Sequence, residues 1–399
     1  MCCSVRILII NDLRQGGGAE VQSERERSYF VAHGHDVFML NFDCDLPYCN
    51  EGRIRNIPLG RSSLEKALYR VFPRPEDSDI KQIIESISPD IIHLNNVYLA
   101  AASVFDAIRY YPVVQTVRDY SIICPKSTCI DNGGVPCGGY SFGKCLRCSF
   151  GSVEYTVRTL IQARYNRIRS RAVDRLLAPS VALCRAASEC GFVITPLNNP
   201  FDFTRISSLP KSIEGKRKYF SYGRISRVKG FDSLIDAWKI FADGHDVELW
   251  IAGTVDNDYE DSFKSLIEGD LSIRYLGKLD YDAVMALYPF LYCVVVPSIW
   301  MENYPNTVLE ALANRTLVIG SDRGGIPEMI GDERFIFNPL DITAISEVLI
   351  RADTIPSKEY SIITGSNYSR VRDNNSQDKY YERLMGVYSD MLEGSSIAC

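Results

Sequence analysis

The chain has 399 residues, more than one compact core usually organises, so two domains are expected. Its 46% hydrophobic and 24% charged residues are typical of a globular protein and exclude a disordered or fibrous chain. The formal net charge of −6 argues against general nucleic-acid binding. No run approaches the roughly 18 apolar residues that a membrane span needs. The first ten residues do not form a signal peptide pattern, and we expect a cytoplasmic protein.

Short β-rich apolar runs alternate with helical stretches along the chain, the pattern of parallel sheets flanked by helices. A first series of strands is expected at 5–10, 36–40, 90–94, 112–117 and 175–178. A second series is expected at 218–222, 247–252, 273–276, 292–296 and 316–320. The segment 198–216 between them has little periodicity and marks the domain boundary. The sequence therefore predicts an α/β protein with two Rossmann-like domains.

A glycine loop follows the first strand, where Gly17 and Gly18 permit close backbone approach to a ligand. Such a loop also occurs in dinucleotide sites. However, it lacks the G-x-G-x-x-G pattern, and the ribose-binding acid is ambiguous among Asp36, Asp43 and Asp45. NAD binding is therefore not favoured.

Five of the 13 cysteines lie in the turn-rich segment 124–148. A loop without its own core gains order from a tetrahedral metal site. The four that we would choose as ligands of a structural zinc are Cys129, Cys137, Cys145 and Cys148. Reduced, partly buried thiols remain an equal alternative, and a disulfide is less expected in the cytoplasm.

Residues 153–177 combine helical apolar spacing with many basic side chains, and we expect one basic helix there. The arginines are Arg158, Arg164, Arg167, Arg169, Arg171 and Arg175. A basic helix of this kind attracts anionic lipid. The alternative is a helix that covers the sheet, with arginine stems over apolar surface. We favour peripheral contact with the inner face of the membrane.

Two cations follow the first strand of the second series. Arg224 comes directly after the strand and Gly223, and Lys229 follows five residues later. The carboxyl end of a parallel sheet is where open α/β folds bind ligands. Arginine grips phosphate oxygens in a bidentate manner, and lysine acts as a point charge. Taken alone, a solvated basic turn is an equal interpretation.

Two carboxylates flank an expected helix start further along the chain. Pro305 breaks any preceding helix, and Asn306 or Thr307 is a competent N-cap. Glu302 then lies on the approach loop, and Glu310 lies in the first turns of the helix. The unpaired N–H groups of a helix N-terminus suit a diphosphate, and the carboxylates can accept hydrogen bonds from sugar hydroxyls.

These motifs in this order resemble glycosyltransferase family 4. The likeness rests on Arg224, Lys229, the Glu302–Glu310 pair, and the segment GGIPE that contains Gly325. In the first half, RILIINDLRQGGGAE, PDIIHLNN and QTVRDYSIICP agree with it. The resemblance implies a GT-B architecture, with two domains facing across a cleft. It also implies a hexosyltransferase-type enzyme that retains anomeric configuration and needs no divalent metal or other catalytic cofactor.

The resemblance also implies a domain division and residue roles. An acceptor-side domain over 1–205 would be completed by a C-terminal helix at 376–399, and a donor domain would span 213–372. Arg224 and Lys229 would hold the donor diphosphate, Glu302 the transferred sugar and Glu310 the ribose. Other donor-binding positions would be Gly17, Gly18, Asn306, Thr307 and Gly325.

Arg118 and Asp119 would lie on the acceptor side, with His93 as a further candidate for acceptor contact. Relatives commonly carry histidine where this chain has Arg118, so that residue either takes over a contact or marks a lost role. The expected function is sugar transfer to a lipid-linked glycan of a bacterial surface polysaccharide. The alternatives are an epimerase or phosphorylase on the same fold, and a binding module without turnover.

Overall fold

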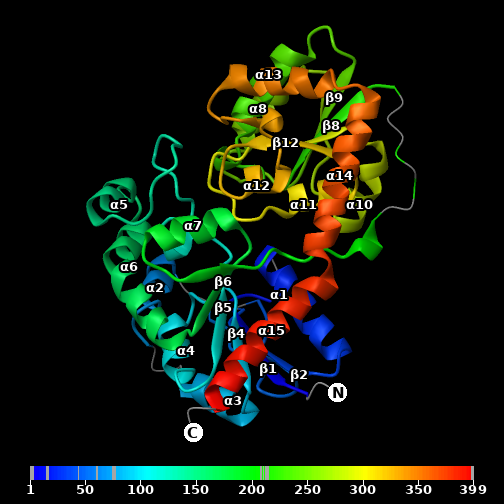
Figure 1. The fold of residues 1–399 in the computed structure, drawn as a ribbon. Coiled ribbons are helices and arrows are strands. Elements are labelled where there is room, and N and C mark those ends of the chain that lie inside the picture. Colours follow the sequence, from blue (N-terminus) through cyan, green and yellow to red (C-terminus); the bar gives the residue numbers. More distant parts are fainter. Residues whose placement is uncertain are drawn as a thin grey trace. The chain divides into compact units, whose positions relative to one another are not determined.

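The computed structural model describes residues 4–14, 18–43, 45–59, 62–73, 78–206, 209, 211 and 215–396 (Figure 1). Internal contacts divide the chain into two compact units. The first comprises Met1–Cys129, Gly138–Leu197 and Tyr381–Cys399. The second comprises Ile130–Cys137 and Asn198–Tyr380. Each unit is an α/β layer structure around one parallel sheet, as the sequence predicts.

The first unit contains a seven-stranded sheet within the described residues, and all of its pairings are parallel. In sheet order the strands are β3 (Ile54–Asn56), β2 (Asp36–Asn41), β1 (Arg6–Asn11), β4 (Ile91–Leu94), β5 (Val113–Thr116), β6 (Arg175–Ala178) and β7 (Ile194–Pro196). Strands β1, β4 and β5 are almost wholly buried, which fits their continuous apolar sequences, because helices cover a parallel sheet on both faces.

The helices of the first unit connect these strands (Figure 1). They are α1 (Gly18–Ala32), α2 (Ser63–Leu68), α3 (Ser78–Ile87), α4 (Ala101–Ala107), α5 (Phe142–Cys148), α6 (Val153–Ala172) and α7 (Val181–Glu189). The last helix, α15 (Gln377–Ser396), packs its aromatic side chains on this unit. The ring of Tyr381 stacks on Tyr29 at 3.7 Å, and Tyr388 is fully buried.

The second unit contains a six-stranded parallel sheet within the described residues. Its strands, in sheet order, are β10 (Ile273–Tyr275), β9 (Val247–Ala252), β8 (Arg217–Tyr222), β11 (Cys293–Val296), β12 (Leu317–Ser321) and β13 (Ile336–Phe337). Its helices are α8 (Phe231–Ala242), α9 (Glu260–Ile267), α10 (Tyr281–Leu287), α11 (Asn306–Ala313), α12 (Ile326–Ile330), α13 (Ile342–Asp353) and α14 (Ser357–Asn375).

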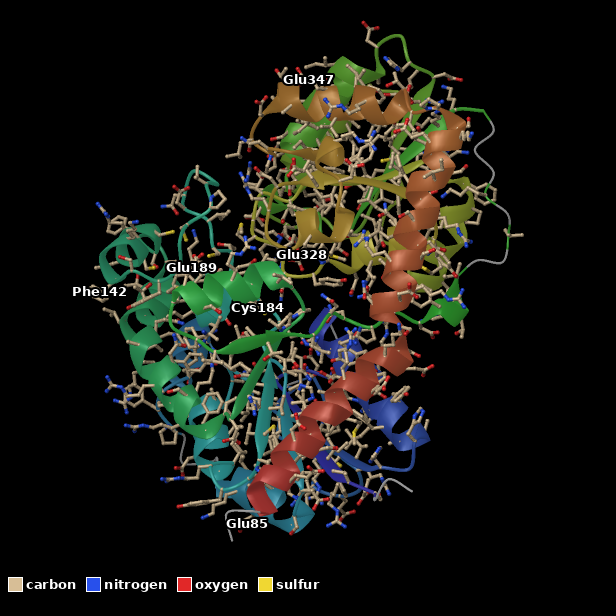
Figure 2. The ribbon with its side chains drawn as sticks, in the orientation of Figure 1. Glu85, Phe142, Cys184, Glu189, Glu328 and Glu347 are labelled. Atoms are coloured by element: carbon tan, nitrogen blue, oxygen red, sulfur yellow. The ribbon has the colours of Figure 1, made fainter. Side chains whose placement is uncertain are left out.

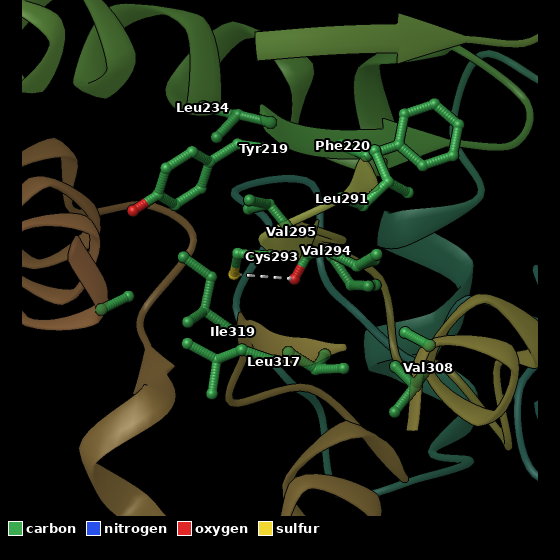
Figure 3. Close-up of a cluster of buried hydrophobic side chains, with 14 of the residues drawn as sticks. Tyr219, Phe220, Leu234, Leu291, Cys293, Val294, Val295, Val308, Leu317 and Ile319 are labelled. Carbon is green, nitrogen blue, oxygen red and sulfur yellow. Dashed lines mark hydrogen bonds between the residues drawn. The ribbon is translucent and has the colours of Figure 1, made fainter. Parts of the chain in front are cut away.

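The core of the second unit gathers around its central strands. Figure 3 shows Tyr219 of β8, Val294 of β11 and Ile319 of β12 within one buried apolar cluster, with Leu234 of α8 and Val308 of α11. Burial of each large aliphatic side chain contributes about 1.5–3 kcal/mol of transfer free energy. This packing fixes the carboxyl ends of β8 and β11, from which the site described below is built.

The ten strands expected from the sequence are all present, with ends that differ by no more than one residue. The strands that the sequence missed are β3, β7 and β13, which have only two or three residues and lie at or near sheet edges. The single helix expected over 153–177 is wrong at its end. Helix α6 stops at Ala172, because Asp174 exchanges hydrogen bonds with Val113 and leads the chain into β6. Arg175 is therefore a strand residue.

No helix among the described residues has the length and apolar character needed to cross a membrane.

Candidate active site

A pocket of about 190 Å³ lies at the carboxyl ends of β8 and β11 in the second unit. This edge is where a parallel α/β sheet offers its loops to ligands. The pocket lining includes Arg224, Lys229, Glu302, Asn306 and Thr307. The lining is completed by Ser221, Tyr222, Gly223, Phe231, Val295, Val296, Pro297, Ser298 and Pro305. Five donor-side residues expected from the sequence thus come together at one pocket.

Lys229 and Glu302 form an ion pair at the centre of this lining. The Lys229 Nζ lies 2.6 Å from Glu302 Oε1, and the Ser298 hydroxyl donates to the same oxygen at 2.6 Å. The Lys229 ammonium also lies 4.4 Å from the centre of the Trp300 ring, within the range of a cation–π contact. The lysine is therefore held in place on two sides, with about a quarter of its side chain exposed.

The ionisation of Glu302 depends on these neighbours. Burial alone would raise the pKa of this carboxyl, but the Lys229 charge, and then hydrogen bonds from Lys229 and Ser298, hold the pKa below its ordinary value. Glu302 is therefore an anion at neutral pH. An ionised carboxylate accepts hydrogen bonds and donates none, which suits it to bind hydroxyl groups.

Arg224 lies at the open side of the pocket. Its Nε donates to Asp256 Oδ1 at 2.6 Å, while 73% of the side chain is exposed. An exposed pair of this kind contributes little to stability, commonly below about 1 kcal/mol. Asp256 thus orients the guanidinium. Replacement of this ion pair by a contact with a ligand anion would cost little stability.

Glu310 lies behind the pocket wall, in α11. It is 7% exposed and accepts a hydrogen bond from the Tyr222 hydroxyl. The Tyr222 hydroxyl also lies 3.0 Å from that of Tyr288. Burial, followed by the Glu310 charge, raises the pKa of Tyr222 well above its usual value, so this phenol stays protonated and donates. Sequence reasoning missed both tyrosines, although Tyr222 directly precedes the Gly223–Arg224 pair.

Helix α11 begins one residue earlier than the sequence analysis expected. Pro305 is the N-cap, and Asn306 and Thr307 are the first two helical residues. The first amides of a helix have no acceptor within the helix, and they carry its positive dipole end. Because Pro305, Asn306 and Thr307 line the pocket, this helix end adds amide donors to the charge of Lys229 and Arg224.

The glycine pair after β12 serves the Glu302 loop. The Gly325 amide donates to the Glu302 carbonyl at 2.8 Å. Gly324 has a φ of +59°, and a Cβ at this position would lie 1.9 Å from that carbonyl oxygen. The close backbone approach expected at this pair is therefore to Glu302, because the Gly325 N–H is already engaged. Contact of Gly325 with a donor stays a prediction, and its amide is not the group that would make it.

The buried Tyr222–Glu310 hydrogen bond leads to a testable prediction. The Tyr222→Phe variant removes a donor from a buried carboxylate, an interaction with a charged partner that contributes about 1.5–3 kcal/mol. If Glu310 binds part of the donor, the donor KM rises about tenfold while kcat changes less. The matched control is Tyr292→Phe, which loses a buried hydrogen bond of 2.6 Å to the Ala352 carbonyl, away from the pocket. An equal rise of KM in both variants would contradict the prediction.

In the first unit, Arg118 is held in a buried ion pair. Its Nη2 lies 2.8 Å from Glu26 Oε1, and its Nε donates to Asn95 Oδ1 at 2.8 Å. The Arg118 side chain is 7% exposed, and that of Glu26 is fully buried. Such a pair is costly to break, since removal of one partner leaves a buried charge. No pattern in the sequence pairs Glu26 with Arg118, which lies 92 residues later in the chain.

The expectation that His93 faces an open acceptor site is wrong. The imidazole is fully buried, with Nδ1 2.7 Å from the Tyr388 hydroxyl and Nε2 2.7 Å from that of Thr116. The pKa of His93 is lowered to about 4, mainly by burial. The charge of Glu26 opposes this lowering, and the charge of Arg118 adds to it. Both ring nitrogens are engaged, so this neutral histidine joins α15 to the sheet.

The remaining residues expected at a site in the first unit are Asp119, Gly18 and Gly17. Asp119 is half-buried, and it accepts hydrogen bonds from the Ser121 amide at 2.8 Å and the Tyr98 hydroxyl at 3.2 Å. Gly18 opens α1, and Gly17 lies outside the described residues.

The four cysteines proposed as zinc ligands do not form a metal site. Among the described residues, no group of three or more histidine, cysteine, aspartate or glutamate side chains is arranged to hold a metal ion. Cys145 and Cys148 lie in helix α5. The Cys145 sulfur accepts a hydrogen bond from the Ser141 amide, and the Cys148 sulfur accepts one from the Lys126 ammonium, each at 3.5 Å. Cys129 is buried. The arrangement therefore does not fit tetrahedral zinc.

The pocket and the fold define a class of enzyme. Residues 203–363, which contain the whole pocket lining from Ser221 to Thr307, match the family model described as glycosyl transferases group 1. The second unit is therefore a glycosyltransferase domain, and the protein is a transferase. Its two parallel-sheet units are those of the GT-B fold.

Three known proteins show the extent of the likeness. The chain is 23% identical over 355 residues to an uncharacterized 42.6 kDa protein in the cps region of Klebsiella pneumoniae, covering 82% of this chain and 87% of that protein. The Anabaena protein HepE, solved in complex with UDP-glucose, has a TM-score of 0.71 at 15% identity, covering 97% of this chain and 100% of that chain. The lipopolysaccharide outer core galactosyltransferase WaaB has a TM-score of 0.64 at 16% identity, covering 96% and 99%.

Proposed function

We propose that the enzyme transfers a sugar from a nucleoside diphosphate donor to a lipid-linked glycan acceptor, with retention of anomeric configuration. The observation that supports this most is the arrangement of Lys229, Arg224 and the N-terminus of α11 around one pocket, with the ionised Glu302 beside them. Two cations and a helix N-terminus suit a diphosphate, and the carboxylate suits sugar hydroxyls.

The proposed reaction breaks the bond between the anomeric carbon and the diphosphate oxygen and forms a bond to an acceptor oxygen. The acceptor hydroxyl loses its proton to the departing phosphate, so the products are the glycoside and the nucleoside diphosphate. Negative charge grows on the leaving oxygen, and Lys229 and Arg224 stabilise it. In this proposal Lys229 exchanges part of its contact with Glu302 for the diphosphate, and Glu302 binds the transferred sugar.

Glu310 is proposed to bind the ribose of the donor. Its orientation is set by Tyr222, which both lines the pocket and donates to the carboxylate. The pocket wall at Tyr222 therefore connects the diphosphate region to the ribose carboxylate. A nucleotide-sugar donor agrees with the UDP-glucose that the Anabaena structure contains, since the two proteins share one fold.

A role in surface polysaccharide synthesis is proposed from the relatives and from α6. One relative is encoded in a cps region, and one structural neighbour acts on the lipopolysaccharide outer core. On α6, Leu160, Arg164, Arg167 and Arg171 are exposed and follow helical spacing, so they share one face. Figure 2 shows exposed Phe142 at the start of the neighbouring α5. A basic and apolar face of this kind suits an anionic membrane surface.

Incubation with labelled nucleotide sugars tests the proposed function. Transfer predicts free nucleoside diphosphate and a labelled glycan that form only with a lipid-linked acceptor. An isomeric nucleotide sugar would identify an epimerase, and binding without product would identify a module without turnover. The same reaction in EDTA is expected to keep its rate, because the pocket supplies its positive charge from side chains and amides.

The proposed membrane contact gives a separate prediction. The triple variant Arg164→Gln, Arg167→Gln, Arg171→Gln removes three exposed charges, each of which contributes about 1 kcal/mol at an anionic surface. Partitioning to vesicles of anionic lipid, measured by sedimentation, should fall on the order of 100-fold. The control variant neutralises exposed Lys239, Lys264 and Arg274 of the second unit. Equal partitioning of the α6 variant and the parent would exclude α6 as the anchor.

A further inference from the structure

Two arginines, Arg70 and Arg158, lie near Tyr98 at the carboxyl ends of the first sheet. Arg70, which follows α2, is only 3% exposed. Its guanidinium lies 4.4 Å from the ring centre of Tyr98 and 5.7 Å from that of Tyr165. Within the described part of the chain, its Nε and Nη1 are buried without a hydrogen-bond partner. Buried polar groups in this state are uncommon and need an explanation.

Helix α6 places Arg158 near Arg70 and Tyr98. Arg158, Gln162 and Tyr165 share one face of α6, since they are four and three residues apart. Gln162 donates to the Ser121 carbonyl at 2.9 Å, and the Ser121 hydroxyl lies 2.6 Å from that of Tyr98. Helix α6 also packs against α2, which leads into Arg70 (Figure 1).

Arg70 and Arg158 are close enough for the charge of one to affect the ionisation of the other. Burial, followed by the charge of Arg70, lowers the pKa of Arg158, as expected for two neighbouring cations. Arg158 has one counter-charge, Glu154, in the preceding turn of α6. Its Nε is also buried without a partner among the described residues. Each of the two guanidinium groups thus has at least one buried N–H donor without a partner among the described residues.

The carboxylates nearby are already engaged by other groups. Asp12, directly after β1, accepts from the Tyr98 amide at 2.8 Å and the Leu99 amide at 3.1 Å. Burial raises the pKa of Asp12 to about 7, against the lowering effect of those amides and of Arg70. Asp12 is therefore an incomplete counter-charge near neutral pH. Asp119 is bonded to the Tyr98 hydroxyl and the Ser121 amide.

We propose that Arg70 and Arg158, beside the ring of Tyr98, bind a phosphoryl group of the acceptor. Guanidinium groups bind phosphate oxygens through their N–H donors, and the unused donors here are Nε and Nη1 of Arg70 and Nε of Arg158. The other Arg158 nitrogens contact the Pro125 carbonyl and Glu154. The strand ends that carry Asp12 and Tyr98 form the edge at which α/β sheets bind ligands. This inference rests on the proposed transferase function and narrows its acceptor to a phosphate-bearing class.

The test measures binding of inorganic phosphate by thermal shift, with the donor pocket saturated by UDP. The parent should be stabilised by phosphate through mass action. Arg70→Met should lose this stabilisation. Because it removes a buried charge with unused donors, its melting temperature without phosphate should equal or exceed that of the parent. The matched control is Arg109→Met, an exposed arginine 5.2 Å from the centre of the Tyr110 ring, which should keep the phosphate response.

The proposal is overturned if neither arginine variant loses the phosphate response. An unchanged phosphate response in Arg70→Met would place the anion elsewhere. If Arg70→Met melts far below the parent, Arg70 has a structural role and Arg158→Met serves as the second variant. An unchanged phosphate response in Arg158→Met would then exclude the site.

The test also separates this proposal from the proposed function. A parent that does not bind UDP would refute the donor assignment, whereas the phosphate response of Arg70→Met reports only on the first unit. Two competitors of transfer distinguish the source of the phosphoryl group. Inhibition by a sugar 1-phosphate alone would indicate a soluble phosphorylated acceptor, and inhibition by a short-chain prenyl diphosphate would indicate a lipid-linked one. Arg70→Met should weaken whichever inhibition is observed.

Discussion

The Lys229→Ala variant should lose about 100- to 1,000-fold in kcat with a nucleotide-sugar donor, the range found when one preorganised donor is removed from a developing anion. The Lys229 Nζ lies 2.6 Å from Glu302 Oε1 and lines the same pocket as Arg224 and the start of α11. Its removal takes positive charge from the leaving diphosphate and leaves Glu302 unpaired. Steady-state kinetics with saturating acceptor measures the effect.

Lys264→Ala is the matched control for Lys229→Ala. Lys264 also forms an ion pair of 2.6 Å, with Glu260, but it is exposed on α9. We expect its kcat to equal that of the parent, since exposed pairs contribute little. A kcat for Lys229→Ala within a factor of a few of the parent would contradict the assigned role of this lysine.

The same variant also predicts a change in the pH dependence of stability. In the parent, the pKa of Glu302 is held below its ordinary value, so its ionised form contributes stability above the unfolded-state pKa. This contribution is lost as pH falls through the lower, folded-state pKa. Without Lys229, burial is the main remaining influence and should raise the pKa of Glu302. The variant should therefore gain stability relative to the parent as the solution is acidified.

The gathering of Arg224, Lys229, Glu302 and Asn306 at one pocket could be predicted from the sequence, because their positions depend on local structure. Arg224 and Lys229 follow one strand, and Glu302 and Asn306 follow another, so the parallel sheet brings both loops to the same edge. The strand pattern itself was clear because β8 and β11 are apolar runs between turn residues. Chain order and strand direction were therefore sufficient to predict this part of the site.

Contacts between distant segments could not be predicted in the same way. His93 bonds to Tyr388, 295 residues later, and Arg118 bonds to Glu26 from α1. A strand-end position gave His93 the pattern of a site residue, but helix α15 buries it. The sequence offers no periodicity that pairs such segments. The unused donors of Arg70 could not be predicted from the sequence either. Whether a donor has a partner among the described residues depends on the folded arrangement of distant segments.

The glycine pair after β12 lies directly against the backbone of the Glu302 loop. Gly324→Ala should reduce transfer about 100-fold, because small displacements of a positioning loop have effects of this size. A Cβ at this position would lie 1.9 Å from the Glu302 carbonyl oxygen and 2.8 Å from its amide nitrogen. The Glu302 loop would have to move, and the ion pair with Lys229 would move with it. Kinetics and thermal unfolding of the variant measure the two consequences.

Gly331→Ala separates this steric effect from the cost of the backbone conformation. Gly331 ends α12 at a φ of +72°, close to the +59° of Gly324, but its nearest Cβ neighbour would be Arg370 Nη2 at 3.7 Å. Alanine there meets only the left-handed conformational cost, about 1–2 kcal/mol, and activity should be kept. If both variants lost stability equally and kept their rates, then contact with the Glu302 backbone would have no role in transfer. A loss of transfer confined to Gly324→Ala would instead show that the spacing between this glycine and Glu302 controls the reactive geometry.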